Sequence, residues 1–233
     1  MSVTTAEPIR AVAKFFFESD RKFFVKGVTY GPFKPDALGN YLGTREQAAR
    51  DLAQIRESGF NVVRVYHCPP RWFLDACAEA GVRALITLPW AKHIEFLSQR
   101  SARNEIIRSV SNAIKMHAGH PAILAYLVGN EIAPQMVRWL GVRRVTEFVE
   151  HLVNVGRNLD PRPLYSLRDL SSDRNSSLPQ NVDFFCFNVY LHKQRDFERY
   201  LLRLQISPRS VRLSLANLGW TRSGTLRTSR RTC

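Results

Sequence analysis

The segment AILAYLVGNEIAPQ (residues 122–135) ends an apolar run with the amide of Asn130 and the carboxyl group of Glu131. Partial desolvation of a carboxyl group beside aromatic rings raises its pKa, so that it can hold a proton near neutral pH. Glu131 is therefore a candidate general acid, and Asn130 could orient a substrate hydroxyl. Alternatively, Glu131 is an acidic residue in the first turn of the next helix, where the helix dipole favours it.

Two more polar side chains stand in or directly after an apolar segment, residues 60–67. Arg64 lies inside the segment, and a buried arginine needs a carboxylate or several carbonyls around it. It could position a catalytic carboxylate, or it could form a structural ion pair. His67 could bind a substrate hydroxyl, or it could cap the end of a strand.

Aromatic side chains mark the ends of several apolar segments. Three of them offer flat faces on which a sugar ring could stack, although such rings can equally belong to the core. These three are Tyr30, Tyr66 and Trp90. Tyr190 follows Asn188 at the end of another segment, and its hydroxyl could donate a hydrogen bond to a catalytic carboxylate.

These residues must be positioned by elements in which strand and helix patterns alternate. Strands are expected at residues 22–30, 60–67, 82–90, 122–129, 163–166 and 182–190, and helices at 44–58, 70–80, 94–117, 134–159 and 196–204. Such alternation predicts a parallel sheet covered by helices, either a barrel or a doubly wound sheet. Polar and aromatic residues at nearly every strand end favour the barrel, whose active site lies there. We therefore predict an α/β fold of the TIM (β/α)8 type, incomplete, with about six of eight strand–helix units.

Composition excludes several other classes of protein. The 233 residues are 45% hydrophobic and 23% charged, no apolar run is long enough to cross a bilayer, and no signal peptide is evident. The four cysteines have no metal-ligand spacing, so we expect no metal and a cytoplasmic location. The net charge of +14 could suggest nucleic-acid binding, but residues 206–233 supply six of the positive charges and the remainder are scattered.

Together the segments KGVTYGPF, GFNVVRVYHCPPRWFLDACAEAGVRALITLPW, HPAILAYLVGNEI and VDFFCFNVYL resemble the catalytic barrel of glycoside hydrolase family 2. That family shares a clan with β-galactosidase, β-glucuronidase and β-glucanases. The resemblance implies hydrolysis or transfer at a β-glycosidic bond, a β-glycoside or β-glucan as partner, and no cofactor. It makes Glu131 the general acid/base and Asn130 a contact to the sugar 2-hydroxyl, with Arg64 supporting the nucleophile. His67, Trp90 and Tyr190 would line the substrate cleft.

The resemblance also implies a second catalytic carboxylate, because retaining glycosidases use two, about 5–5.5 Å apart. In the clan this nucleophile is a glutamate ending strand seven, but residues 206–233 contain no acidic residue. Read in another codon frame, residues 211–217 can encode a strand ending in Ser-Glu. We therefore expect a truncated, frameshifted barrel that lacks the nucleophile and is inactive. Its expected parts are an N-terminal extension (1–14), a partial barrel (15–205) and a disordered basic tail (206–233).

Three other interpretations remain open at the level of sequence. The chain could be a non-catalytic carbohydrate-binding remnant. Similar barrels also occur fused to family 2 glycosyltransferase domains, so this one could serve such a partner. Finally, the arginine-rich tail could bind nucleic acid, in which case deletion of residues 206–233 should abolish salt-sensitive DNA binding.

Overall fold

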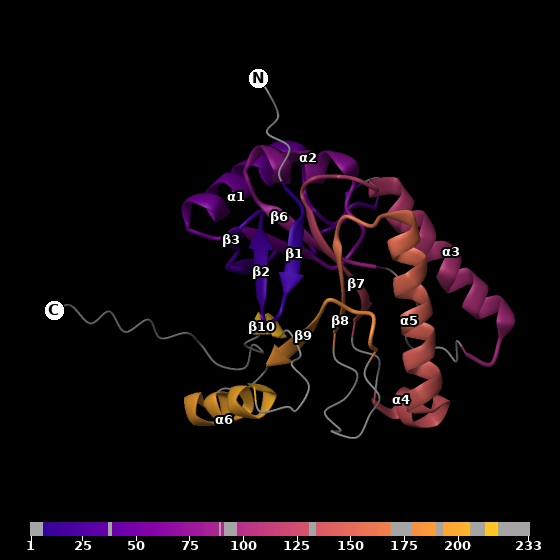
Figure 1. Ribbon diagram of the computed structural model, residues 1–233. Helices are drawn as coiled ribbons and strands as arrows, with labels where there is room; N and C mark the ends of the chain where they lie inside the picture. Colours follow the sequence, from indigo (N-terminus) through magenta and orange to yellow (C-terminus); the bar gives the residue numbers. More distant parts are fainter. Residues whose placement is uncertain are drawn as a thin grey trace.

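A curved parallel sheet with helices on its outer face forms the centre of the molecule (Figure 1). The computed structural model describes residues 7–36, 39–88, 90, 97–130, 134–168, 179–189, 193–205 and 213–218. The sheet has the strand order β10-β9-β8-β7-β6-β5-β4, and every neighbouring pair is parallel. Its strands are β4 (Gly27–Thr29), β5 (Val62–Val65), β6 (Arg83–Thr87), β7 (Ile123–Asn130), β8 (Leu164–Arg168), β9 (Phe184–Val189) and β10 (Leu213–Leu218).

The strands are connected by helices, as a barrel of this type requires. These are α1 (Arg45–Glu57), α2 (Arg71–Glu79), α3 (Arg100–His117), α4 (Pro134–Leu140), α5 (Val142–Leu159) and α6 (Gln194–Gln205). Helices α3 and α5 lie side by side along one flank of the sheet (Figure 1). The start of α1 is fixed by Thr44, whose side chain accepts a hydrogen bond of 3.2 Å from the backbone N–H of Gln47.

The described strands confirm an incomplete α/β barrel. Successive residues of a strand point to opposite faces of the sheet. In β5, Val63 and Val65 therefore face the helices, whereas Val62 and Arg64 face the concave side. The sheet curls so far that Cα atoms of its two edge strands, β4 and β10, approach within 8 Å. The carboxyl ends of the strands are thereby gathered at one end of the curved sheet.

A small antiparallel sheet at the N-terminus closes the opposite end of this barrel. Its strands are β1 (Ile9–Val12), β2 (Phe15–Glu18) and β3 (Arg21–Lys22). Ile9 is buried in the apolar cluster on the concave side of the large sheet, and Phe16 packs edge-to-face on Phe184 with ring centroids 5.1 Å apart. Because Phe184 begins β9, the small sheet covers the amino ends of the strands. Among the described residues it does not reach the carboxyl ends.

The antiparallel sheet differs from the sequence prediction, which placed one long strand at residues 22–30. In the structure Arg21–Lys22 belongs to β3, and the parallel strand β4 is only Gly27–Thr29. Phe23 packs against the cluster on the concave side, and its backbone N–H donates to the carbonyl of Phe16 at 2.8 Å. The apolar run in this segment therefore serves two sheets, which a strand pattern alone does not reveal.

Two helix boundaries also differ from the prediction. The helix expected at residues 134–159 is divided at Gly141, which has a φ of 87°. That conformation is strained for residues with a Cβ atom, so the glycine ends α4 and starts α5 in a new direction. The helix expected from residue 94 begins at Arg100.

The segment after α6 differs most from the prediction. Disorder was expected from residue 206, but Leu213–Leu218 forms β10, with Leu213 opposite Phe185 and Leu218 opposite Val189. The strand sequence LSLANL is rich in leucine, so an apolar strand pattern stands within an otherwise basic and polar segment. The parallel sheet consequently has seven strands among the described residues rather than about six.

Candidate functional site

The carboxyl ends of β5, β6 and β7 bring together most of the described site residues. Arg64 and Tyr66 lie at the end of β5, Trp90 follows β6, and Asn130 closes β7. The backbone of Asn130 is in register with Arg168 of β8. Glu131 and Tyr190 lie outside the described residues, so their predicted roles as acid and as carboxylate partner stay predictions.

Trp90 fixes the end of β7 from the neighbouring strand. Its indole Nε1–H donates a hydrogen bond of 2.6 Å to the carbonyl of Val128, and only 8% of the residue is exposed. The ring also packs edge-to-face on Phe148 of α5, with centroids 6.2 Å apart. Trp90 therefore positions the backbone that leads to Asn130 and Glu131, a role that the sequence did not indicate.

Gly129 is required by this close packing. A Cβ atom at this position would lie 2.6 Å from Cδ1 of Leu167 and 3.5 Å from Cζ2 of Trp90. Any side chain would thus push Leu167 or the end of β7 out of place. The glycine lets two neighbouring elements approach the strand immediately before the candidate acid.

Arg64 is buried, with 3% of its surface exposed, and it lies on the concave side of the sheet. Its guanidinium carbon lies 4.6 Å from the centroid of the Tyr66 ring, close enough for a cation–π interaction. The arginine is consequently held beneath a half-buried ring at the mouth of the barrel. This arrangement places a permanent positive charge on the concave side of the sheet, near the carboxyl end of β5.

His67 and Tyr30, two predicted substrate contacts, have different surroundings. His67 is exposed and stacks on Tyr41, with centroids 4.7 Å apart and planes 17° apart. Tyr30 is 5% exposed, stacks on Phe73, and donates its hydroxyl to Asp51 at 2.8 Å. Burial and the Asp51 carboxylate raise the pKa of Tyr30. Tyr30 therefore packs in the core, whereas the His67–Tyr41 pair offers aromatic surface.

The sequence interpretation missed Tyr41 and two small polar residues inside the barrel. Tyr41 lies between β4 and α1, and its carbonyl accepts a 2.8 Å hydrogen bond from the Phe33 N–H. No sequence motif predicts this contact. Ser166 of β8 is fully buried and donates to the carbonyl of Phe184 at 2.9 Å. Its inward position could have been inferred from alternation in β8, where Leu164 shares the concave face. Thr87 of β6 is buried as well.

Cys68 follows His67 but does not supply a nucleophile. Burial raises the pKa of its thiol to about 11, so the group is protonated at neutral pH. Its Sγ lies 3.7 Å from the carbonyl of Ala113, with the thiol as donor. Among the described residues, no three His, Cys, Asp or Glu side chains gather closely enough to hold a metal ion. In the same part of the chain, no helix is both long and apolar enough to cross a membrane.

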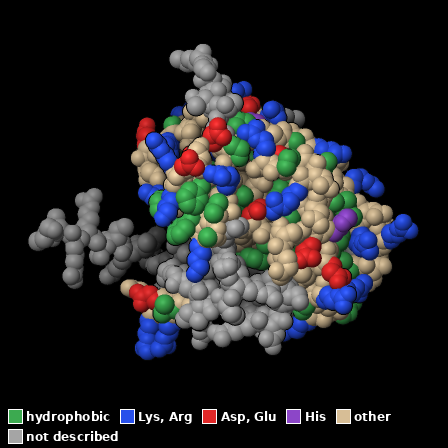
Figure 2. Space-filling view, viewed as in Figure 1, with side chains coloured by type: hydrophobic (Ala, Val, Ile, Leu, Met, Phe, Trp, Pro, Cys, Tyr) green, Lys and Arg blue, Asp and Glu red, His purple; other side chains and the backbone are tan. Residues whose placement is uncertain are grey.

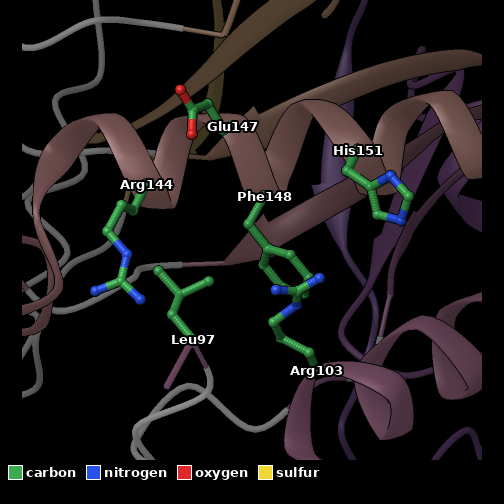
Figure 3. Close-up of a pocket in the computed structure, with 6 residues that line it drawn as sticks. All are labelled: Leu97, Arg103, Arg144, Glu147, Phe148 and His151. Atoms are coloured by element: carbon green, nitrogen blue, oxygen red, sulfur yellow. The ribbon is translucent and has the colours of Figure 1, made fainter. Parts of the chain in front are cut away.

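A groove on the outer face lies behind Trp90, between α3 and α5 (Figure 3). Its volume is about 270 Å³, and Phe148, the ring on which Trp90 packs, forms part of its lining. Phe148 therefore contacts both the groove and Trp90.

Comparison with known proteins identifies relatives that modify glucans. The sequence model described as glucanosyltransferase, glycoside hydrolase family 72, matches residues 1–155. The 1,3-beta-glucanosyltransferase gel1 of Aspergillus fumigatus is 25% identical over 200 residues, which cover 78% of this chain and 44% of that protein. The 1,3-beta-glucanosyltransferase gas4 of Schizosaccharomyces pombe is 24% identical, with the same two coverages. The chain thus spans less than half the length of these curated relatives.

Solved structures share the fold but are distant in sequence. Beta-glucuronidase 2 of Bacteroides uniformis has a TM-score of 0.71 and 19% identity, covering 88% of this chain and 26% of its own. A beta-glucuronidase of Ruminococcus gnavus has a TM-score of 0.72 and 13% identity, with 89% and 37% covered. The expected likeness to β-glucuronidase barrels is therefore confirmed at the level of the fold. The assignment to family 2 is wrong, because the matching sequence family is 72.

Proposed function

We propose that the barrel of this chain binds a β-1,3-linked glucan beside Glu131. The premise is its family: the chain belongs to the glucanosyltransferases of glycoside hydrolase family 72. The observation that carries the proposal is the fixed end of β7, where Trp90 holds the Val128 carbonyl and the chain runs directly into Asn130 and Glu131. A rigid strand end is the kind of support that positions a catalytic carboxyl group. The related fungal proteins, named as 1,3-beta-glucanosyltransferases, supply the substrate class.

The proposed chemistry of Glu131 is general acid/base catalysis. In the first step of a retaining reaction, a carboxylate attacks the anomeric carbon while the leaving glycosidic oxygen takes a proton from the acid. In the second step, an acceptor hydroxyl gives its proton to the same group, attacks the anomeric carbon and releases the carboxylate. With a sugar hydroxyl as acceptor the result is glucan transfer, and with water it is hydrolysis.

The mechanism needs a second carboxylate, which is expected in β10, but this strand has no acidic residue. This strand lies next to β9 and reads LSLANL, and residues 206–233 contain no Asp or Glu. Asn217 is in register with Asn188 near the carboxyl end of β9, on the strand where the resemblance places a nucleophile. We therefore infer that the barrel binds glucan but transfers it at a rate roughly 10³-fold or more below that of a complete pair of carboxylates.

A transfer assay tests both parts of the proposal. The chain is mixed with β-1,3-linked glucan oligosaccharides, binding is measured by calorimetry, and longer and shorter products are followed by mass spectrometry. We expect binding without redistribution of lengths. Asn217→Glu should produce redistribution, and the isosteric control Asn217→Gln should not.

A second assay replaces the missing carboxylate with a small external nucleophile. Azide and an aryl β-glucoside with a good leaving group should give the α-glucosyl azide, because azide attacks the anomeric carbon once and inverts it. Redistribution of oligosaccharides by the unmodified chain, lost in Glu131→Gln, would overturn the inferred inactivity. Absence of glucan binding would overturn the proposal as a whole.

A further inference from the structure

The groove between α3 and α5 is lined by one stripe of α5 and by residues that face it. Figure 3 shows Arg144, Glu147, Phe148 and His151 along α5, with Arg103 of α3 and Leu97 opposite. The four α5 residues are spaced i, i+3, i+4 and i+7, so they share one face of the helix. Helices α3 and α5 pack against each other, and side chains from both line the groove.

The electrostatic balance of this groove is positive. Arg103 and Arg144 are exposed, and within the described part of the chain neither guanidinium makes a hydrogen bond or an ion pair. The acidic lining residue, Glu147, is already engaged, since its carboxylate accepts a hydrogen bond of 2.7 Å from Nε of Arg143. In Figure 2, Lys and Arg side chains lie over α3 and α5, with some Asp and Glu side chains beside them. The lining of the groove thus has two guanidinium groups without an ion-pair partner among the described residues and one carboxylate that is paired with Arg143.

The apolar part of the groove is formed by two buried side chains. Phe148 is 6% exposed and its ring is held against Trp90, while Leu97 is 9% exposed. Guanidinium groups bind phosphate with paired, charge-assisted hydrogen bonds. The volume of about 270 Å³ is near the lower end of small-molecule sites, too small for a polymer.

We propose that this groove binds a small phosphomonoester, of the size of a sugar phosphate, through the guanidinium groups of Arg103 and Arg144 that line it. This site lies outside the barrel mouth and does not depend on the glucan proposal. The shared chemistry, a phosphomonoester, can be presented by a free metabolite or by a lipid headgroup. The small groove favours the free molecule.

Calorimetry with glucose 1-phosphate tests the site in the full chain. We expect the double variant Arg103→Gln/Arg144→Gln to bind at least about tenfold more weakly, because two charge-assisted contacts are lost. The matched control is Arg56→Gln/Arg108→Gln, which removes the same charge from exposed positions on α1 and α3 outside the groove. Its affinity should stay within about twofold of the unmodified chain, as expected for remote surface changes.

Two further ligands identify the source of the phosphate. Methyl glucoside, which lacks the phosphate, should not bind in the groove, and phosphatidylcholine vesicles containing phosphatidic acid should bind no better than vesicles without it. Vesicle binding lost in the double variant but kept in its control would assign the phosphomonoester site to a lipid headgroup instead. Equal affinities of the two double variants for glucose 1-phosphate, or no binding by the unmodified chain, would overturn the site.

Discussion

At the amino ends of the strands, Arg83 is buried and bound by backbone carbonyls and a carboxylate, whereas at the carboxyl ends Trp90 supports the backbone and Tyr66 packs on the buried Arg64. Arg83 at the closed end donates to the carbonyls of Pro121 and Glu7 and to the carboxylate of Glu18. At the open end Trp90 supports the Val128 carbonyl, and His67 remains exposed. The closed end, at the amino ends of the strands, is held by contacts within the protein, and the open end, at the carboxyl ends, is where we propose that glucan binds.

We expect substitutions at the closed end to lower mainly the free energy of unfolding, and substitutions at the open end to lower glucan affinity as well. A buried group whose contacts are all within the protein contributes mainly to the free energy of unfolding. A group that supports the ligand-facing backbone should affect glucan affinity as well, because small displacements there matter. Substitutions of similar size at the two ends can therefore test the division directly.

The largest effect is expected for Phe184→Ala at the closed end. The residue is 3% exposed and packs on Phe16, so the change leaves a cavity and lowers the free energy of unfolding by about 3–4 kcal/mol. Denaturant unfolding measures the loss, and glucan affinity of the folded fraction should not change. The same substitution at Phe24, which is 65% exposed, is the control and should stay within about 0.5 kcal/mol. A large loss of affinity in Phe184→Ala would contradict the division.

Gly129→Ala should have a smaller effect on stability and a clear effect on binding. The new Cβ atom would meet Leu167 at 2.6 Å, and because Cδ1 is the end of a flexible side chain, part of the strain can relax. We expect a loss of about 1–2 kcal/mol in stability and about tenfold in glucan affinity. Gly27→Ala is the control, since its Cβ atom would lie 3.5 Å from the nearest atom. Unchanged affinity in Gly129→Ala would remove the case for a tightly positioned β7 end.

The sequence predicted the fold well where one strand pattern served one sheet. The apolar segments that became β5, β6 and β7 were each placed within a few residues of the observed strands. The N-terminal sheet was missed because Phe23 and its neighbours supply apolar residues to two sheets. β10 was missed because its leucines lie among arginines, threonines and serines, which dominated the interpretation of the segment.

Individual site residues were harder to predict than the end of the barrel where they lie. Strand ends indicated Arg64, Tyr66 and Trp90, and these lie at the same end of the sheet. However, an aromatic ring at a strand end does not reveal whether it faces a ligand or the core. Tyr30 is turned into the core by Asp51 and Phe73, which are distant in sequence. Such contacts depend on packing between elements, which periodicity does not encode.

Trp90→Phe is the more conservative test at the open end. It keeps an aromatic ring but removes the Nε1–H that donates to Val128, so we expect a loss of about 1 kcal/mol in stability. Glucan affinity should fall by less than in Gly129→Ala, because the backbone retains its neighbours. Trp139→Phe, at a residue that is 68% exposed, is the matched control for both measurements. A larger loss of stability than in Phe184→Ala would reverse the proposed roles of the two ends.

The smallest effect concerns His117, which is fully buried at the end of α3 in the helix layer and so belongs to neither end of the barrel. Burial lowers its pKa, an effect that the Pro69 backbone opposes and that His120 and Arg71 reinforce. The unfolded chain therefore takes up a proton at a higher pH than the folded chain does, so stability falls as the pH falls through the unfolded pKa of about 6.5. Between pH 7 and pH 6 the contribution is at most about 0.7 kcal/mol.

His117→Gln should flatten this pH dependence, whatever its own effect on stability at pH 7. His151→Gln makes the same substitution at an exposed residue and is the control with which the slope of His117→Gln is compared. Unfolding curves at several pH values between 7 and 5.5 give both slopes, and glucan affinity measured over the same range shows whether the open end responds. Because His117 lies in the helix layer, its protonation should lower the free energy of unfolding. It should leave the glucan affinity of the folded chain unchanged, as we expect for substitutions at the closed end. A slope that survives in His117→Gln would assign the acid sensitivity to another group.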